Sequence, residues 1–180
     1  MFKKILLISL TVVLLTACRS PQSRTSTTTG TTTDTISAPT VTFDDSKKGT
    51  TESNIEYCNI DQVSLLLDFY WPATGDAPFP VALYVHGGGW TEGDNTENGE
   101  KYIEALTTKG VAVAAVNYRL APEYQFPAMI EDVKCAVRYV RANATELGID
   151  PDRIGAFGGS AGGHLSLMMG TTGKDGDPKK

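Results

Sequence analysis

From Asn54 onward, short apolar runs alternate with longer segments in which apolar residues recur every three or four positions. The short runs predict buried strands, and the longer segments predict helices that pack one face on a sheet. The expected strands are Val63–Tyr70, Val81–Val85, Val111–Val116 and Arg153–Phe157, and the expected helices are Gly99–Lys109, Pro127–Leu147 and Ala161–Met169, with a turn at Asp150–Asp152. This alternation predicts an α/β domain over residues 54–180, with a mostly parallel sheet flanked by helices.

The first residues of the chain have a different pattern. Two lysines precede the apolar segment Ile5–Ala17, so residues 1–17 are predicted to be a secretory signal. The segment ends in Leu-Thr-Ala-Cys, which resembles the lipobox of bacterial lipoproteins and implies a lipid on Cys18. An ordinary signal peptide with a chance cysteine is the alternative. Because Arg19 follows the cysteine, we expect export to the outer membrane or the cell surface of a bacterium.

Between the signal and the domain lies a segment without apolar periodicity. Residues 25–42 contain ten threonines among eighteen residues. Such a segment buries too little apolar surface to offset its ordering entropy. We therefore predict a flexible tether over residues 18–53, with a glycosylated stalk as the alternative.

Composition excludes several functions. The chain has 16 Lys and Arg against 21 Asp and Glu, for a net charge of −5, so it lacks the basic surface that nucleic-acid binding requires. Three cysteines without metal-ligand spacing predict neither a zinc site nor a disulfide scaffold, and no cofactor is expected. Cys58 and Cys135 either pair in a disulfide or remain buried thiols; the sequence leaves both open.

The segment Gly158–Gly162 reads G-G-S-A-G and fits the G-x-S-x-G pattern between a predicted strand and a predicted helix. In that context the chain turns so sharply that neighbouring positions exclude side chains, which explains the glycines. The turn exposes the hydroxyl of Ser160 beside the positive end of the following helix. A serine nucleophile is therefore predicted.

A second glycine-rich segment, His86-Gly87-Gly88-Gly89-Trp90, follows the strand Val81–Val85. Backbone N–H groups of consecutive glycines can face an anion without obstruction, which an oxyanion hole requires. A plain glycine loop and a phosphate cradle are the alternatives, although the Lys-Ser/Thr pair of a phosphate loop is absent. Trp90 either lines the substrate site or packs against the protein.

Together these motifs resemble the α/β-hydrolase fold, in particular the carboxylesterases similar to hormone-sensitive lipase and to feruloyl and acetyl-xylan esterases. The matching segments are His86–Trp90 with Gly93-Asp94, Asn117–Glu123, Phe126–Ala128 with Glu131–Val133, Asp150–Ile154 and Gly158–His164. The resemblance implies that Ser160 is the nucleophile. It implies oxyanion donors on Gly88, Gly89 and Ala161, with Gly87 as a further donor. Arg119 and Glu123 are expected to form structural ion pairs.

The triad of this fold runs Ser, then Asp or Glu, then His along the chain. The sequence contains only His86 and His164, and beyond the nucleophile only Asp175 and Asp177 are acidic. His86 is expected to hold the glycine loop, and His164 lies on the same rigid helix as the nucleophile. We therefore expect the N-terminal part of a longer esterase, truncated after the nucleophile elbow and inactive as 180 residues alone.

Three functions follow from these observations. The first is acyl transfer through Ser160 on acetyl, feruloyl or other small acyl esters, including esters linked to polysaccharide. The second is an α/β-hydrolase peptidase, against which Ala161 and the glycine loop argue. The third is a non-catalytic surface lipoprotein that retains a decayed hydrolase fold.

Overall fold

The computed structural model describes residues 42–95 and 99–172. The predicted signal segment, Cys18, most of the predicted tether, Asp175 and Asp177 lie outside the described residues. The described elements are η1 (Asp45–Lys47), β1 (Thr51–Ile60), β2 (Val63–Tyr70), β3 (Phe79–Val85), α1 (Glu100–Thr107), β4 (Ala112–Val116), α2 (Ala128–Ala142), α3 (Ala144–Leu147), β5 (Ile149–Gly158) and α4 (Ala161–Thr171). All the predicted strands and helices are present, and β2 has the predicted bounds.

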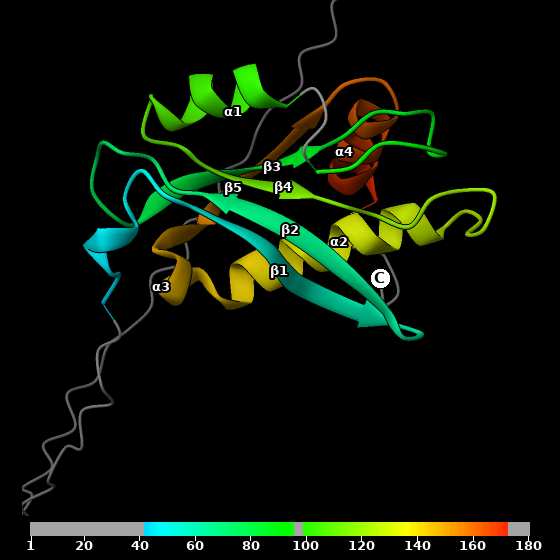
Figure 1. Ribbon diagram of the computed structural model, residues 1–180, viewed down its shortest axis with the longest axis horizontal. Coiled ribbons are helices and arrows are strands. Elements are labelled where there is room, and N and C mark those ends of the chain that lie inside the picture. The colour runs from blue at the N-terminus through cyan, green and yellow to red at the C-terminus, as the bar shows by residue number, and fades with distance from the viewer. Residues whose placement is uncertain (1–41, 96–98, 173–180) are drawn as a thin grey trace, which may run out of the picture. The chain divides into compact units, whose positions relative to one another are not determined.

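The five strands form one sheet in the order β1-β2-β4-β3-β5 (Figure 1). β3 runs parallel to both β4 and β5, whereas β1 pairs antiparallel with β2 and β2 antiparallel with β4. The sheet is therefore mixed: among the described strands, β1, β3, β4 and β5 run in one direction, as a mostly parallel sheet requires, and β2 runs against them. The antiparallel pairing of β1 with β2 has a local cause, the two-residue turn at Asp61 and Gln62, whose φ angles of 52° and 69° suit a tight hairpin. Such a short turn can only join antiparallel strands.

Helices cover both faces of this sheet. α1 lies on one face, and α2 and α3 lie on the other, as Figure 1 shows. Successive residues of a strand point to opposite faces of the sheet, so β3 contributes side chains to both faces. Leu83 and Val85 belong to the core under α2 and α4. Tyr84 packs with Ile103 of α1 on the other face. This arrangement confirms the predicted α/β architecture.

Two predicted boundaries are wrong. The expected helix 127–147 is interrupted at Asn143, whose side-chain Nδ2 donates to the Tyr139 carbonyl 2.8 Å away. Such a side-chain bond competes with the helical backbone pattern. The expected turn at residues 150–152 lies inside β5, although the Asp152 N–H does donate to the Asp150 carboxylate at 3.0 Å.

The folded domain also begins before residue 54. η1 and the first residues of β1 fall within the predicted tether, and the ring of Phe43 meets Phe79 edge-on at 5.7 Å. The start of β1 is polar and exposed, so it carries no apolar signal. Its place in the sheet comes from pairing, in which Thr51 lies opposite Tyr70.

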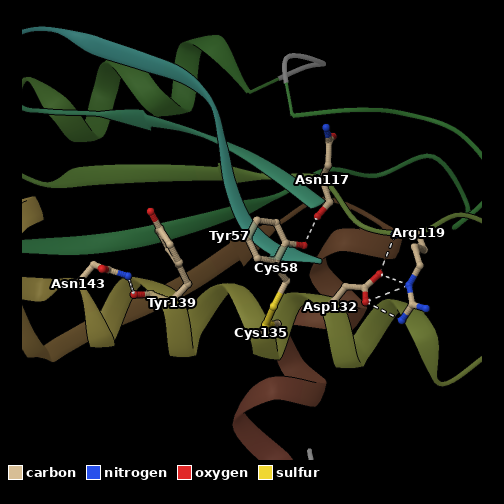
Figure 2. The surroundings of a disulfide bond; sticks show 8 residues. All are labelled: Tyr57, Cys58, Asn117, Arg119, Asp132, Cys135, Tyr139 and Asn143. Atoms are coloured by element: carbon tan, nitrogen blue, oxygen red, sulfur yellow. Dashed lines mark hydrogen bonds and ion pairs between the residues drawn. A yellow bond between two sulfur atoms is a disulfide. The ribbon is translucent and has the colours of Figure 1, made fainter. Parts of the chain in front are cut away.

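A disulfide joins Cys58 of β1 to Cys135 of α2, which settles the alternative that the sequence left open (Figure 2). The two Cα atoms are 6.5 Å apart, within the usual range for a disulfide. The bond closes a loop between residues separated by 77 positions. It therefore ties the hairpin to the helix that covers the adjoining face of the sheet.

Removing this disulfide is expected to lower the free energy of unfolding by about 2–4 kcal/mol, because the unfolded chain regains the freedom that the closed loop denies it. The measurement is urea denaturation of the wild-type protein with and without reductant. The control is a variant with both Cys58→Ser and Cys135→Ser. Its urea midpoint of unfolding should be the same with and without reductant. An unchanged wild-type midpoint after reduction would contradict the expectation.

Candidate active site

Ser160 lies at the turn between β5 and α4, with an exposed side chain and a φ of 53°. A non-glycine residue rarely adopts such a φ, so the surrounding structure must hold it. The neighbouring glycines explain how. A Cβ on Gly158 would lie 2.2 Å from the Val85 carbonyl oxygen, and one on Gly162 would lie 2.0 Å from it. The elbow thus packs directly against the end of β3.

The glycine loop begins where β3 ends. Gly88, Gly89 and Trp90 have φ angles of 103°, 59° and 63°, so three successive residues adopt left-handed conformations. The Gly88 carbonyl accepts bonds from the N–H groups of Thr91 and Glu92 at 3.0 and 3.1 Å, which closes the loop. Glycine adopts such angles without strain. Trp90 is the one residue of the three that is not a glycine, so its backbone is strained.

The two motifs meet in space. β3 and β5 are parallel neighbours with Val85 paired to Gly158, so the glycine loop and the elbow leave the sheet side by side. A Cβ on Gly87 would lie 3.2 Å from the Gly159 carbonyl oxygen and 3.8 Å from the Ser160 Cβ. The carboxyl ends of parallel strands are where ligands bind in α/β folds. The structure therefore brings together the predicted nucleophile and the predicted donor loop.

The remaining predicted donor, Ala161, is the first residue of α4 and is buried. The first N–H groups of a helix have no partner within it and carry partial positive charge. The N–H groups near Ser160 therefore come from two sources, the first turn of α4 and the glycine loop. Such fixed donors can stabilise negative charge that develops on an oxygen bound at Ser160.

Two cavities border the loop. One, of about 880 Å³, is lined by Ser160, Gly87 and Gly88 and by aromatic side chains of Tyr84, Tyr102 and Phe157, among others. The other, of about 320 Å³, is lined by Gly89, Trp90, Ala121, Phe126, Met129, His164 and Leu165. The glycine loop thus has a cavity on the Gly87 side and an apolar cavity on the Gly89 side.

Trp90 lies between the loop and α4. Its ring meets the ring of His164 edge-on, with centroids 5.3 Å apart, and 38% of the residue is exposed. A bulky residue at positive φ, held with an exposed indole, is an arrangement that packing alone does not require. Trp90 lines the apolar cavity beside Gly89.

Both histidines of the chain are engaged elsewhere than at the serine hydroxyl. His86 is buried, and its Nδ1 donates to the Gly87 carbonyl at 2.7 Å, which sets the tautomer because a carbonyl only accepts. His164 lies one helical turn beyond Ser160, where its backbone N–H donates to the Ser160 carbonyl at 3.0 Å. Its imidazole ring meets the ring of Trp90 edge-on. His86 has the loop-holding place that the sequence predicted.

Sequence reasoning missed the partner of Arg119. Its guanidinium and backbone N–H donate four hydrogen bonds of 2.8–3.1 Å to the carboxylate of Asp132 on α2, not to Glu123 (Figure 2). These hydrogen bonds raise the pKa of Arg119 above its ordinary value. One signal could have found the pair, since Asp132 stands among apolar residues on the buried face of its helix. The pair fixes the segment that follows β4.

Comparison with known proteins assigns the chain to a family. The family model described as BD-FAE matches residues 67–179. The chain belongs to the BD-FAE family. Carboxylesterase NlhH of Mycobacterium tuberculosis is 43% identical over 107 residues, which cover 59% of this chain and 33% of NlhH. Esterase LipC of the same species is 39% identical over 98 residues, covering 54% of this chain and 24% of LipC.

Solved structures show the same fold. The thermophilic esterase Est2 of Thermogutta terrifontis superposes with a TM-score of 0.61 at 33% identity, over 68% of this chain and 44% of Est2. Its form with butyrate bound gives the same TM-score. The fold is thus that of the α/β-hydrolase esterases. The chain spans about a third or less of the length of the curated relatives NlhH and LipC.

Other kinds of site are not evident in this BD-FAE domain. Within residues 42–95 and 99–172, no helix combines the length and apolar character that crossing a bilayer requires. Over the same residues, no three His, Cys, Asp or Glu side chains gather as ligands for a metal ion.

If the whole protein hydrolyses esters through the predicted oxyanion hole, Gly88→Ala is expected to lower kcat by roughly 10²–10³, because a displaced loop no longer aims its N–H groups at the oxyanion. The new Cβ would lie 2.0 Å from the Glu92 carbonyl oxygen at a φ of 103°, so the loop must move. The measurement is steady-state ester hydrolysis. The matched control is Gly155→Ala in β5, where a Cβ would meet nothing within 4 Å. Equal losses in both variants would refute a special role for Gly88.

Proposed function

We propose that the protein is a serine carboxylesterase that forms an acyl-enzyme on Ser160. The observation that carries the proposal is the strained, exposed Ser160, lying against the glycine loop at Gly87. The carboxylesterase and esterase names of the relatives support it. A non-catalytic protein would have no need to hold a serine at a φ of 53°.

In the proposed reaction, Ser160 Oγ attacks the ester carbonyl and a general base takes the hydroxyl proton. The negative oxygen of the tetrahedral intermediate is stabilised by N–H groups of Gly87, Gly88, Gly89 and Ala161. The alcohol leaves with a proton, and water then releases the acid. Because His86 and His164 are engaged elsewhere, the proposal assigns the base, and the Asp of the triad, to residues that this sequence does not contain.

The proposed substrates are esters of acetyl, feruloyl or other small acyl groups, free or linked to polysaccharide. Trp90 is the proposed contact for an apolar group of the ester, because it lines the apolar cavity of about 320 Å³ beside Gly89. The structures of Est2 with propionate and with butyrate bound support small acyl groups. The larger cavity beside Ser160 offers room for the other part of the ester.

The test is covalent labelling of the whole native protein with a fluorophosphonate, together with hydrolysis of p-nitrophenyl acetate, p-nitrophenyl butyrate and methyl ferulate. We expect the label on Ser160 and turnover of at least one ester. The choice of reagent is supported by Est2, which has been solved phosphonylated by sarin. A protein that neither reacts at Ser160 nor turns over any ester would instead be the non-catalytic lipoprotein. Cleavage of peptides alone would indicate the peptidase.

We further propose that the enzyme is exported and held on a bacterial membrane, in the outer membrane or at the cell surface, by a lipid on Cys18. The lipobox-like sequence before Cys18 supports this. The Cys58–Cys135 disulfide supports an oxidising compartment. Cys18→Ser is expected to move the protein from the membrane fraction to the soluble fraction. A variant that stays in the membrane fraction would contradict the anchor.

A further inference from the structure

Tyr118 follows β4 and lies directly beneath the glycine loop. Its ring stacks on the ring of His86, with centroids 4.2 Å apart and planes 9° from parallel. Both residues are buried, with 4% and 1% of their surface exposed. The phenol hydroxyl donates to the carbonyl of His86 at 3.1 Å and to that of Gly87 at 3.3 Å. One side chain thus contacts two successive peptide units of the loop.

Those two contacts determine where the next N–H groups point. A trans peptide unit is planar, and its C=O and N–H bonds point in opposite directions. A carbonyl of His86 held toward Tyr118 therefore directs the N–H of Gly87 away from it. The carbonyl of Gly87 does the same for the N–H of Gly88, and His86 Nδ1 holds that carbonyl from a second direction at 2.7 Å.

We propose that Tyr118 is a positioning residue for the oxyanion hole, which sets the direction of the Gly87 and Gly88 N–H groups through the carbonyls behind them. The inference rests on the proposed esterase function, because the value of aligned N–H groups lies in stabilising an oxyanion. Glycines have no side chains with which to restrict their own peptide units. The loop therefore needs its orientation imposed from outside.

The phenol suits this task chemically. Burial raises the pKa of Tyr118 to about 12. The hydroxyl therefore stays protonated, and remains a donor, throughout the pH range in which esterases act. Neighbouring residues of the same segment hold the rest of the loop: the Asn117 side-chain oxygen accepts from the Asn95 N–H at 2.7 Å, and the Ala121 N–H donates to the Trp90 carbonyl at 2.8 Å. The segment after β4 thus supports the loop at several points.

The test compares Tyr118→Phe with Tyr57→Phe in the whole protein. Tyr57 is a matched control, because it is also buried and donates its hydroxyl to a backbone carbonyl of the same segment, that of Asn117, at 2.6 Å (Figure 2). Each variant loses one phenol hydroxyl and keeps the ring. Tyr118→Phe removes the hydroxyl shared between the carbonyls of His86 and Gly87, and Tyr57→Phe removes the one that donates to Asn117. A merely structural hydroxyl would therefore produce the same effects in both.

We expect Tyr118→Phe to lower kcat by roughly 10- to 100-fold while KM changes less than about threefold, because misaligned donors weaken transition-state stabilisation more than substrate binding. Tyr57→Phe should keep kcat within about twofold. In NMR spectra of isotope-labelled protein, the Gly87 and Gly88 amide signals should shift or broaden only in Tyr118→Phe.

The NMR comparison decides the inference even without turnover. If the wild-type protein hydrolyses no ester, the proposed function fails, and the two amide signals still show whether Tyr118 orients the loop. Amide signals that match the wild type in Tyr118→Phe would overturn the inference. Equal disturbance of those signals, or an equal loss of kcat, in both variants would also overturn it.

Discussion

Replacing Ser160 by alanine is expected to reduce ester hydrolysis by the whole protein by roughly 10⁶-fold in kcat, the scale reached when a serine nucleophile is removed. No acyl-enzyme can form without the hydroxyl, and the N–H groups of the glycine loop can then assist only attack by water. The fold should not change, because the hydroxyl is exposed and alanine also fits the elbow. The measurement combines ester turnover with fluorophosphonate labelling, and both should be lost together.

Ser166→Ala is the control for this experiment. Ser166 lies on α4, the same helix, and its hydroxyl donates to the Gly162 carbonyl at 2.8 Å rather than serving the site. Its removal should leave turnover within a few-fold of the wild type. Retention of turnover in Ser160→Ala would contradict the acyl-enzyme mechanism, and a parallel loss in Ser166→Ala would point to damage to the helix instead.

Asp132→Ala is expected to lower the free energy of unfolding by about 3–5 kcal/mol, because it leaves the guanidinium of Arg119 buried without a counter-charge. Only 8% of the Arg119 side chain and none of the Asp132 side chain is exposed, so water cannot replace the carboxylate. The loss is a large part of the 5–15 kcal/mol that typically stabilises a folded domain. Urea denaturation measures it.

Another Arg–Asp ion pair, between Arg153 and Asp150, serves as the control for Asp132→Ala. Arg153 and Asp150 are 2.6 Å apart, but their side chains are 54% and 26% exposed. Pairs exposed to water contribute about 0–1 kcal/mol, so Asp150→Ala should barely move the unfolding midpoint. Similar urea midpoints for Asp132→Ala and Asp150→Ala would show that the buried Arg119–Asp132 pair contributes no more to the free energy of unfolding than the exposed pair does.

The sequence predicted those parts of the site that follow from local chain geometry. Each motif stands at the end of an apolar strand, and parallel strands place their carboxyl ends at one edge. The motifs placed Ser160 and Gly87 in loops that follow predicted strands, and the structure shows that these loops are adjacent. The glycines at 158 and 162 were predictable for a similar reason, since a sharp strand-to-helix turn excludes side chains there.

Contacts between distant segments were beyond sequence reasoning. The sequence predicted a structural ion pair for Arg119 but named no partner, and the structure shows that the partner is Asp132 on another element. The stacking of Tyr118 on His86 joins residues 32 positions apart, and no pattern along the chain marks it. Similarly, the antiparallel place of β1 depends on its register with β2 rather than on apolar residues of its own.

The disulfide between Cys58 and Cys135 has a use beyond stabilising the domain. In a reducing cytosol the two sulfurs would remain thiols, whereas an oxidising compartment allows them to pair. The presence or absence of the bond therefore indicates in which compartment a given molecule folded. If the protein is exported as proposed, an exported molecule should be lighter by two hydrogen atoms and have no reactive thiol at Cys58 and Cys135, whereas a molecule that has not left the cytosol should react with a thiol reagent at both. Counting thiols would thus distinguish the two populations within one cell extract.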